Sequence, residues 1–491
     1  MGGDATTGGS AGSRRSLLAG LAGAVRDGRL LAVEVVEESL RRIGAAEELN
    51  AVVALRSAGA LEDAARLDEA IRRGTDQVGP LAGLPLLVKD IEAAAGLPTT
   101  YGSLTHAERG PVPRDGVVAG RLREAGAIVV GKTNVPEFAF EGYTANRVFG
   151  PTRNPWAPAL SPGGSSGGSA AALAAGLAPL VTATDVGGSI RIPAALCGLV
   201  GLKPTAGLIG RDPDLASLEL NNHGPLTATV ADARLLLELL RGPAIGDPGS
   251  LPVWSPAQRP LPSRILVGDR HAEGPALSDA VAGAFTTAVE ALSRAVGASI
   301  ERVAPSTVFP GGYDAHDWFR IVGFEQAHAL GRETIEREGD RFDPVFHRSM
   351  TAALEVTADE HAAARRRRLR YVAELDRLLG DGSILATPTL TVEGWSAEGV
   401  LAGRDEPGLP GTVYNTEPPN LTGHPAISLP AGMLPNGLPF GLQLLGPRFG
   451  DWLLLDVAAV WEATRPWPLV APGYRPFAEA AIEAPTADRG R

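Results

Sequence analysis

The chain has 491 residues, of which 44% are hydrophobic and 21% charged, as is ordinary for globular enzymes. Its formal net charge of -11 disfavours nucleic acid as a partner, because phosphate binding requires clustered basic residues. A single cysteine, Cys197, excludes an intramolecular disulfide and a zinc site built from several cysteines. The eight histidines are scattered and form no HExxH pattern, so we expect neither a metal nor a cofactor.

The N-terminal segment allows two interpretations. Arg14-Arg15 and the apolar residues after it resemble a twin-arginine export signal. The apolar stretch is short, however, and continues directly into helical periodicity, which favours a disordered tail followed by an amphipathic helix. No apolar run reaches the length of a membrane span. We therefore expect a cytoplasmic protein, with export as the alternative.

The first half of the chain alternates helical and strand-like segments. The spacing of apolar residues predicts helices at 16–43 and 60–73. Short apolar runs predict buried strands at 84–90 and 127–131, with a helix at 116–125 between them. This alternation indicates an α/β architecture.

The same alternation continues after the glycine-rich centre of the chain. An alanine-rich segment predicts a helix at 169–176, and a strand follows at 179–184. Residues 244–263 are rich in proline and glycine and are expected to form a surface connection. Further helices are predicted at 280–297 and 357–380.

The segment Asp185–Ser189 reads DVGGS, so that an apolar strand ends in two glycines and a serine. Glycines let the backbone turn tightly and aim successive N–H groups at one point. Such a turn can hold the oxyanion of a tetrahedral intermediate while Ser189 attacks a carbonyl. Taken alone, the motif is more often a plain structural turn.

A second glycine- and serine-rich loop, Gly163–Ser169, precedes the alanine-rich helix. Its serines lie at a helix N-terminus, where free N–H groups and the helix dipole favour developing negative charge. Helix capping accounts for Ser169. It does not account for Ser165 and Ser166, which are framed by four glycines.

Lys89 follows the apolar run Leu86–Val88. A lysine in such a setting loses hydration, so its pKa falls and it can act as a base. Successive side chains of a strand point to opposite faces, so Asp90 need not pair with Lys89. The structural alternative is a lysine whose amino group reaches water from the strand end. A neutral lysine can activate a serine nucleophile without a Ser-His-Asp triad.

Together these segments resemble a known family. The run SPGGSSGGSAAALAAGLAPLVTATDVGGSIRIPAALCGLVGLKPT, Ser161–Thr205, is similar to the signature of the amidase signature family. The resemblance extends over residues 16–470. Its other matching blocks are GPLAGLPLLVKD (Gly79–Asp90), GLPTTYGS (Gly96–Ser103), VVGKTNVPEF (Val129–Phe138), FGPTRNPW (Phe149–Trp156), NLTGHPAISLPAG (Asn420–Gly432) and GLPFGLQLLG (Gly437–Gly446).

The resemblance implies a fold and a domain organisation. The fold would be one α/β domain, with a central twisted mixed β-sheet covered by α-helices on both sides. The domain would span 16–475, between a disordered tail at 1–15 and a loosely ordered tail at 476–491. Within the domain, the expected parts are a signature core at 79–210, a variable region at about 244–380 and a C-terminal block at 383–470.

The resemblance also implies residue roles. Ser189 matches the nucleophile, Ser165 the proton relay whose preceding peptide bond is cis, and Lys89 the general base. Three further side chains match supporting positions, namely Ser166, Asp185 and Arg191. The backbone N–H groups that match the oxyanion hole are those of Val186, Gly187, Gly188 and Ser189.

The implied reaction is hydrolysis of a small-molecule carboxylic amide to an acid and an amine or ammonia through an acyl-Ser189 intermediate. In this family the segment after VPEF shapes the substrate pocket, so we predict that Phe138, Ala139 and Tyr143 bind substrate. Three more aromatic residues are candidates for the same pocket or for ordinary core positions, namely Phe140, Trp318 and Phe319. The expected assembly is a monomer or a homodimer.

Three other functions remain open from the sequence. The glutaminase (A) subunit of a tRNA-dependent amidotransferase shares the signature, but Ile192 stands where that subunit is expected to carry glutamine. An esterase is the second, either with the same triad or as an α/β-hydrolase; Gly163–Gly167 fits GxSxG, although no apolar strand precedes it. The third is a non-catalytic interaction protein, which the occupied catalytic positions do not support.

Overall fold

A computed structural model gives the fold and describes residues 14–74, 78–212, 219–271, 276–401, 404 and 415–477. Of the tails predicted at 1–15 and 476–491, residues 1–13 and 478–491 lie outside the described residues. Contacts extend to the edges of the described chain, because Arg14 Nη2 donates to the Trp467 carbonyl at 2.8 Å. Phe477, near the other edge of the described chain, is 5% exposed and belongs to the main core.

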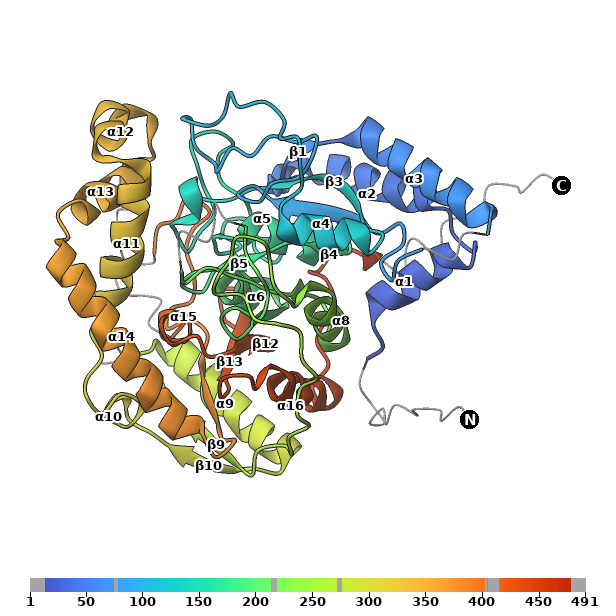
Figure 1. The fold of residues 1–491 in the computed structure, drawn as a ribbon. Helices are drawn as coiled ribbons and strands as arrows, with labels where there is room; N and C mark the ends of the chain where they lie inside the picture. Colours follow the sequence, from blue (N-terminus) through green and yellow to red (C-terminus); the bar gives the residue numbers. More distant parts are fainter. Residues whose placement is uncertain are drawn as a thin grey trace.

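The N-terminal helices lie on one side of the molecule (Figure 1). The single helix predicted at 16–43 is two helices, because the chain turns at Gly28, whose φ of 66° is unfavourable for other residues. The helix predicted at 60–73 is confirmed. These elements are α1 (Leu17–Arg26), α2 (Ala32–Ala45), η1 (Glu47–Leu49) and α3 (Ser57–Arg72).

The first sheet has four strands in the order β1-β3-β2-β4. Strand β2 runs parallel to β3 and β4, whereas β1 is antiparallel to β3. The two predicted strands and the helix between them are confirmed. The elements are β1 (Val52–Leu55), β2 (Pro85–Lys89), α4 (Val117–Glu124), β3 (Ile128–Thr133), η2 (Glu137–Ala139), α5 (Gly167–Ala174) and β4 (Leu180–Val181).

The second sheet has seven strands in the order β10-β9-β11-β13-β12-β6-β8 and is also mixed. A separate two-stranded ladder pairs β5 with β7. The strands are β5 (Thr184–Asp185), β6 (Val200–Lys203), β7 (Asn222–His223), β8 (Leu226–Thr227), β9 (Arg264–Val267), β10 (Ser299–Arg302), β11 (Ile384–Pro388), β12 (Ala426–Met433) and β13 (Pro439–Leu445).

Two groups of helices complete the fold. Helices α11 to α14 of the variable region lie together, on the side of the molecule opposite α1 to α3 (Figure 1). The group comprises α10 (Pro305–Val308), α11 (Asp317–Leu330), α12 (Arg332–Arg337), η3 (Gly339–Arg341), α13 (Pro344–Ala353) and α14 (Ala358–Leu379). The other helices are α6 (Arg191–Cys197), α8 (Val230–Leu240), α9 (Asp279–Val296), α15 (Glu417–Thr422) and α16 (Asp451–Thr464).

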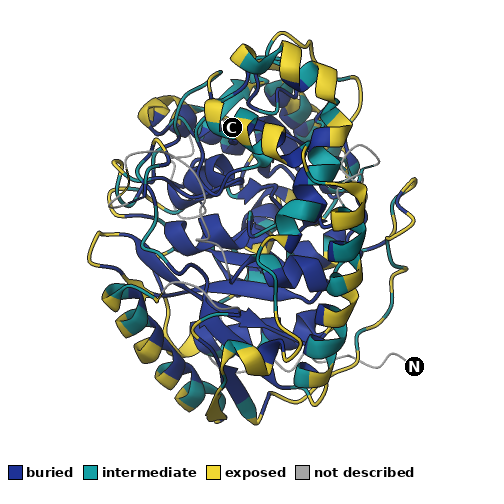
Figure 2. Ribbon diagram, turned by 90° about the vertical axis from the view of Figure 1, so that its left-hand side faces the viewer, coloured by how far each residue is buried: buried dark blue, intermediate teal, exposed yellow. Residues whose placement is uncertain are grey.

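Most strands lie in the buried centre of the molecule, whereas the edge strand β10 is exposed. The other exposed residues lie mainly on the surrounding helices and loops (Figure 2). Strands β2, β3, β11 and β13 are buried along their whole length. The structure is therefore the α/β fold with mixed sheets and surrounding helices that the sequence predicts. The side chains of Lys89 on β2 and Thr184 on β5 are consequently buried.

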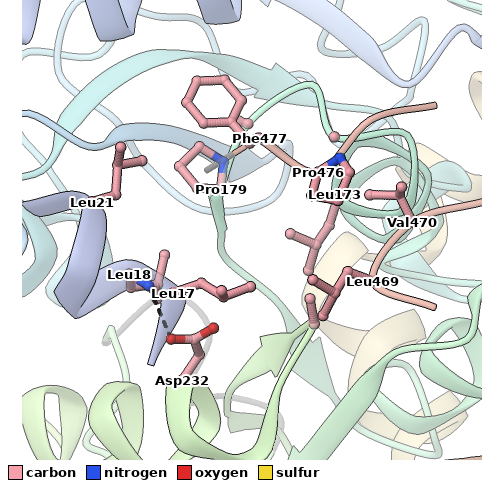
Figure 3. Close-up of a pocket in the computed structure, with 13 residues that line it drawn as sticks. Leu17, Leu18, Leu21, Leu173, Pro179, Asp232, Leu469, Val470, Pro476 and Phe477 are labelled. Atoms are coloured by element: carbon pink, nitrogen blue, oxygen red, sulfur yellow. Dashed lines mark hydrogen bonds between the residues drawn. The ribbon is translucent and has the colours of Figure 1, made fainter. Parts of the chain in front are cut away.

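Helix α1 is an integral part of the core. Figure 3 shows Leu18 and Leu21 near Leu173 of α5 and Phe477 of the C-terminal segment. The Asp232 carboxylate of α8 accepts a hydrogen bond from the Leu18 amide at 3.1 Å. Across the described ranges, every helix is too short or too polar to cross a membrane.

Replacing Leu21, which is 1% exposed, with alanine should lower the free energy of unfolding by about 2–5 kcal/mol, because the substitution leaves a cavity in the core. Urea denaturation followed by tryptophan fluorescence measures the change. The matched control is Leu369→Ala on α14, where the side chain is 69% exposed and the cost should stay within about 0.5 kcal/mol. Equal stability of the two variants would contradict the placement of α1 in the core.

Candidate active site

Lys89 is the last residue of β2 and is fully buried. Its Nζ donates to the Ser165 hydroxyl and to the Thr184 hydroxyl, each at 2.8 Å. Burial lowers the pKa of Lys89 to about 7, although the carboxylates of Glu92 and Asp185 act in the opposite direction. A large fraction of this amine is therefore uncharged near neutral pH.

Asp90 does not pair with Lys89, as strand alternation predicts. Its carboxylate lies 3.4 Å from Lys132 Nζ and accepts hydrogen bonds from the Thr100 amide and hydroxyl. Burial raises the pKa of Asp90, while the Lys132 charge opposes that rise. The two buried lysines thus have different surroundings: Lys132 faces the Asp90 carboxylate, whereas Lys89 faces two hydroxyl groups.

Ser165 lies in the loop before α5 and is 1% exposed. The Gly164–Ser165 peptide bond is cis, in line with the expectation from the resemblance. Glycine is required at 164, because a Cβ there would lie 2.5 Å from the Tyr143 carbonyl oxygen. The neighbouring Ser166 donates from Oγ to the Thr184 carbonyl at 3.3 Å, which joins the loop to β5.

The predicted capping role of Ser169 is wrong. Helix α5 begins at Gly167, so Ser169 lies inside its first turn. Its hydroxyl donates to the Thr182 carbonyl at 2.8 Å and lies 2.8 Å from the Thr133 hydroxyl. The side chain therefore links α5 to the strands beside Lys89. Sequence could not reveal this, because the link depends on how distant strands pack.

The turn that carries Ser189 is held from within by Asp185. The carboxylate accepts hydrogen bonds from the Gly188 amide at 2.7 Å and the Ile190 amide at 3.2 Å. Arg191 clamps the same carboxylate through Nε and Nη2, each at 2.9 Å. Burial alone would raise the pKa of Asp185, but the Arg191 charge outweighs it and holds the pKa below its usual value.

The amides of this turn are not equivalent. The Gly188 N–H already donates to Asp185, whereas the amides of Val186, Gly187 and Ser189 donate to no group in the described parts of the chain. The carbonyls are held separately: Trp318 Nε1 donates to the Val186 oxygen at 2.9 Å, and the Thr416 hydroxyl to the Gly187 oxygen at 2.7 Å. Of the four amides predicted to form the oxyanion hole, Gly188 therefore has an internal acceptor, and the other three have none among the described residues.

The structure brings Lys89 and Ser165 into direct contact and places Ser189 on the adjoining turn. The Ser189 carbonyl accepts a hydrogen bond from the Ser166 amide at 3.3 Å. The Ser189 hydroxyl itself makes no hydrogen bond to Ser165 or to any other residue that the structure describes. Catalytic hydrogen bonds often tighten only when substrate is bound.

A cavity of about 170 Å³ opens beside Ser165 and Thr184. Its lining includes Phe138 and Ala139, which are predicted to bind substrate, and two of the aromatic candidates, Phe140 and Trp318. Polar groups on its wall that the sequence analysis missed are Tyr101, Asn221 and Gln326. No pattern around these three residues distinguishes them from ordinary surface or core positions.

Tyr143, which is predicted to bind substrate, and Phe319, which the sequence leaves open between pocket and core, do not line this cavity. The Tyr143 side chain is buried in an apolar cluster with Ile192 and Trp395, and its ring fills the space beside Gly399. Phe319 packs near Gly323 and the buried cluster of α11 and α13. Both are ordinary core aromatics, because tertiary packing rather than sequence distance from VPEF decides which rings reach the cavity.

A buried polar group near Lys89 was also missed. Glu92 Oε1 lies 3.1 Å from His223 Nδ1, and Glu92 also accepts a hydrogen bond from Thr182. Thr182 in turn accepts from the Lys89 amide at 2.9 Å. Within the described residues, no cluster of three or more histidine, cysteine, aspartate or glutamate side chains could hold a metal ion.

Comparison with known proteins shows the family of this chain. The family model described as Amidase matches residues 34–455. The chain belongs to the amidase family. It is 34% identical to an acylamidase of Rhodococcus erythropolis over 91% of this chain and 95% of that protein.

Two further relatives bear on the reaction. The chain is 34% identical to the A subunit of the glutamyl-tRNA(Gln) amidotransferase of Nocardia farcinica, over 88% of this chain and 94% of that protein. Its fold matches a bacterial aryl acylamidase of the amidase signature family with a TM-score of 0.82 and 27% identity, over 97% of this chain and 100% of that chain. This amidase is accordingly a hydrolase that acts on the C–N bond of carboxamides.

Replacing Arg191 with methionine should cost about 3–5 kcal/mol of folding free energy, because it leaves the Asp185 carboxylate buried without its counter-charge. Chemical denaturation measures the loss. The control is Arg234→Met, which removes an ion pair to Asp456 whose side chains are 37% and 43% exposed and should cost less than about 1 kcal/mol. A similar small loss in both variants would contradict the structural role of Arg191.

Proposed function

We propose that this amidase cleaves its substrate with Ser189 as nucleophile, Ser165 as proton relay and neutral Lys89 as general base. One observation carries the proposal. The buried Lys89 Nζ lies 2.8 Å from the Ser165 hydroxyl, and burial brings the pKa of this lysine to about 7. An amine that is partly neutral and bonded to a hydroxyl is suited to remove its proton.

The reaction then proceeds by two proton transfers and one attack. Lys89 accepts the Ser165 proton, Ser165 accepts the Ser189 proton, and Ser189 Oγ bonds to the amide carbon. The amides of Val186, Gly187 and Ser189 stabilise the oxyanion. The C–N bond breaks as Ser165 returns a proton to the amine nitrogen and recovers one from Lys89. Water then attacks the acyl-Ser189 ester by the same route and releases the acid.

The cavity supports an apolar or aromatic acyl or aryl group as part of the substrate. Its wall beside Ser165 includes Phe138, Phe140 and Trp318, and the lining among the described residues contains no charged side chain. Transfer of an apolar group from water to such a wall lowers the free energy and so favours binding. The names of the acylamidase and aryl acylamidase relatives are consistent with this class.

The glutaminase function is the second candidate, because amidotransferase A subunits are as similar to this chain as the acylamidase is. Free glutamine carries an α-ammonium and an α-carboxylate, which an uncharged wall would leave without ionic partners. Comparison of glutamine with an aryl amide as substrates of the isolated chain distinguishes the two functions. An ester with the same acyl group tests whether the triad also works as an esterase.

We infer that the protein works in the cytoplasm as a catalytically self-sufficient chain. The segment after Arg14-Arg15 is helix α1, whose Leu18 and Leu21 are buried, so its removal as an export signal would open the core. The three proposed catalytic residues and the cavity all come from one chain. A monomer therefore suffices for activity, and a homodimer would not be required.

Ser189→Ala and Lys89→Ala should each lower kcat for an aryl amide by about 10⁴-fold or more, because each removes an obligatory part of one mechanism. Steady-state kinetics of the purified variants measures this loss, and thermal unfolding checks that they remain folded. Ser299→Ala, on the exposed strand β10, is the control and should retain wild-type turnover. Near-normal turnover by folded Ser189→Ala would refute the nucleophile.

A further inference from the structure

Trp318 connects the variable region to the catalytic turn. It is the second residue of α11, and its indole Nε1 donates to the Val186 carbonyl at 2.9 Å. The same ring lies over Gly187, where an added Cβ would be 3.0 Å from Cε2 and Nε1. It also lines the cavity beside Ser165. One side chain thus contacts both the turn and the substrate cavity.

The hydrogen bond to Val186 has a consequence for the next amide. In a trans peptide the C=O and N–H groups point in opposite directions, and the Val186–Gly187 bond is trans. When the indole holds the Val186 oxygen, the Gly187 N–H therefore points away from the indole. That N–H donates to no group in the described residues, so no described protein group competes with a substrate oxygen for it.

The turn itself has little to fix this peptide plane, because glycine places few steric limits on its backbone. The following peptide is fixed independently, since the Thr416 hydroxyl donates to the Gly187 oxygen at 2.7 Å and the Gly188 amide donates to Asp185 at 2.7 Å. The Val186–Gly187 plane depends instead on Trp318. Without the indole N–H, this peptide plane could rotate, and the Gly187 amide, one of the three without a protein acceptor, would lose its fixed orientation.

The start of α11 is well anchored. The Asp317 carboxylate accepts hydrogen bonds from Arg367 Nε at 2.8 Å and from the Tyr371 hydroxyl at 2.7 Å, both on α14. The Trp318 ring packs against Phe140, with ring centroids 5.8 Å apart. These contacts restrict the indole, so its N–H can restrict the peptide in turn.

We propose that Trp318 is a positioning residue for the oxyanion hole: its indole N–H orients the Val186–Gly187 peptide so that the Gly187 amide meets the developing oxyanion. This inference rests on the proposed function of Ser189. It also gives the variable region a part in catalysis. Trp318, which lines the cavity beside Ser165, would also orient the amide that contacts the reacting carbonyl. Residues of α11 would thereby affect turnover as well as substrate choice.

Trp318→Phe keeps an aromatic ring and removes the N–H. We expect kcat for an aryl amide to fall about tenfold, less than the loss of an oxyanion donor itself, with KM changed less than about twofold. An aryl trifluoromethyl ketone forms a tetrahedral adduct with a serine, whereas the planar product acid does not. The Ki of the ketone should rise by the same factor as kcat/KM falls, and the Ki of the acid should stay constant.

The matched control is Trp461→Phe. Trp461 Nε1 donates to the Pro430 carbonyl at 3.0 Å, an equivalent indole bond in the core away from the cavity, so its loss should leave kcat and both Ki values unchanged. If Trp318→Phe fails to fold, β-(3-benzothienyl)alanine at position 318 removes the same N–H with a ring of equal size. The expected changes are then identical.

Three results would overturn the inference: unchanged kcat in a folded variant, a loss confined to KM, or equal weakening of the ketone and the acid. Its failure is distinguishable from failure of the proposed function. An inactive Ser189→Ala together with a fully active Trp318→Phe would refute only the role of Trp318. Turnover by Ser189→Ala would refute the nucleophile, whatever Trp318→Phe shows.

Discussion

The site depends on one arrangement, a lysine amine removed from water that has hydroxyls rather than a carboxylate as its hydrogen-bond partners. Lys89 Nζ contacts Ser165 and Thr184 at 2.8 Å, and its burial favours the uncharged form. A carboxylate in direct contact would favour the charged amine and would be incompatible with the proposed role of Lys89 as a base. The alternation of β2 prevents this, because it directs Asp90 to Lys132 instead.

The other carboxylates near Lys89 also have hydrogen-bond partners other than the lysine amine. Asp185 lies in the turn that carries Ser189. Arg191 donates two hydrogen bonds to its carboxylate, which also accepts a hydrogen bond from the Gly188 amide. The Glu92 carboxylate accepts a hydrogen bond from the Thr182 hydroxyl and lies 3.1 Å from His223 Nδ1. Each carboxylate near Lys89 thus has its own partner. Such buried pairs cost desolvation energy, which the surrounding hydrogen bonds offset.

The sequence predicts those features of the fold and the site that depend on residue type and on the periodicity of neighbouring residues. The apolar run before Lys89, the opposite orientation of Asp90 and the glycine-rich turns follow from period and residue type. The sequence does not predict environments that depend on tertiary packing. Tyr143 lies in a buried apolar cluster, and the Ser169 hydroxyl donates to the carbonyl of Thr182 rather than capping its own helix. Trp318 was recognised only as an aromatic candidate, because its bond to Val186 joins segments far apart in the chain.

The most direct test of the neutral lysine is the rate at which a fluorophosphonate labels Ser189 as a function of pH. The base works only when deprotonated, so the rate should rise as the pH passes the Lys89 pKa of about 7 and then level off. In Lys89→Met the labelling should be slow and lack this step. A wild-type rate that does not change across this range, or a label on another residue, would contradict the account.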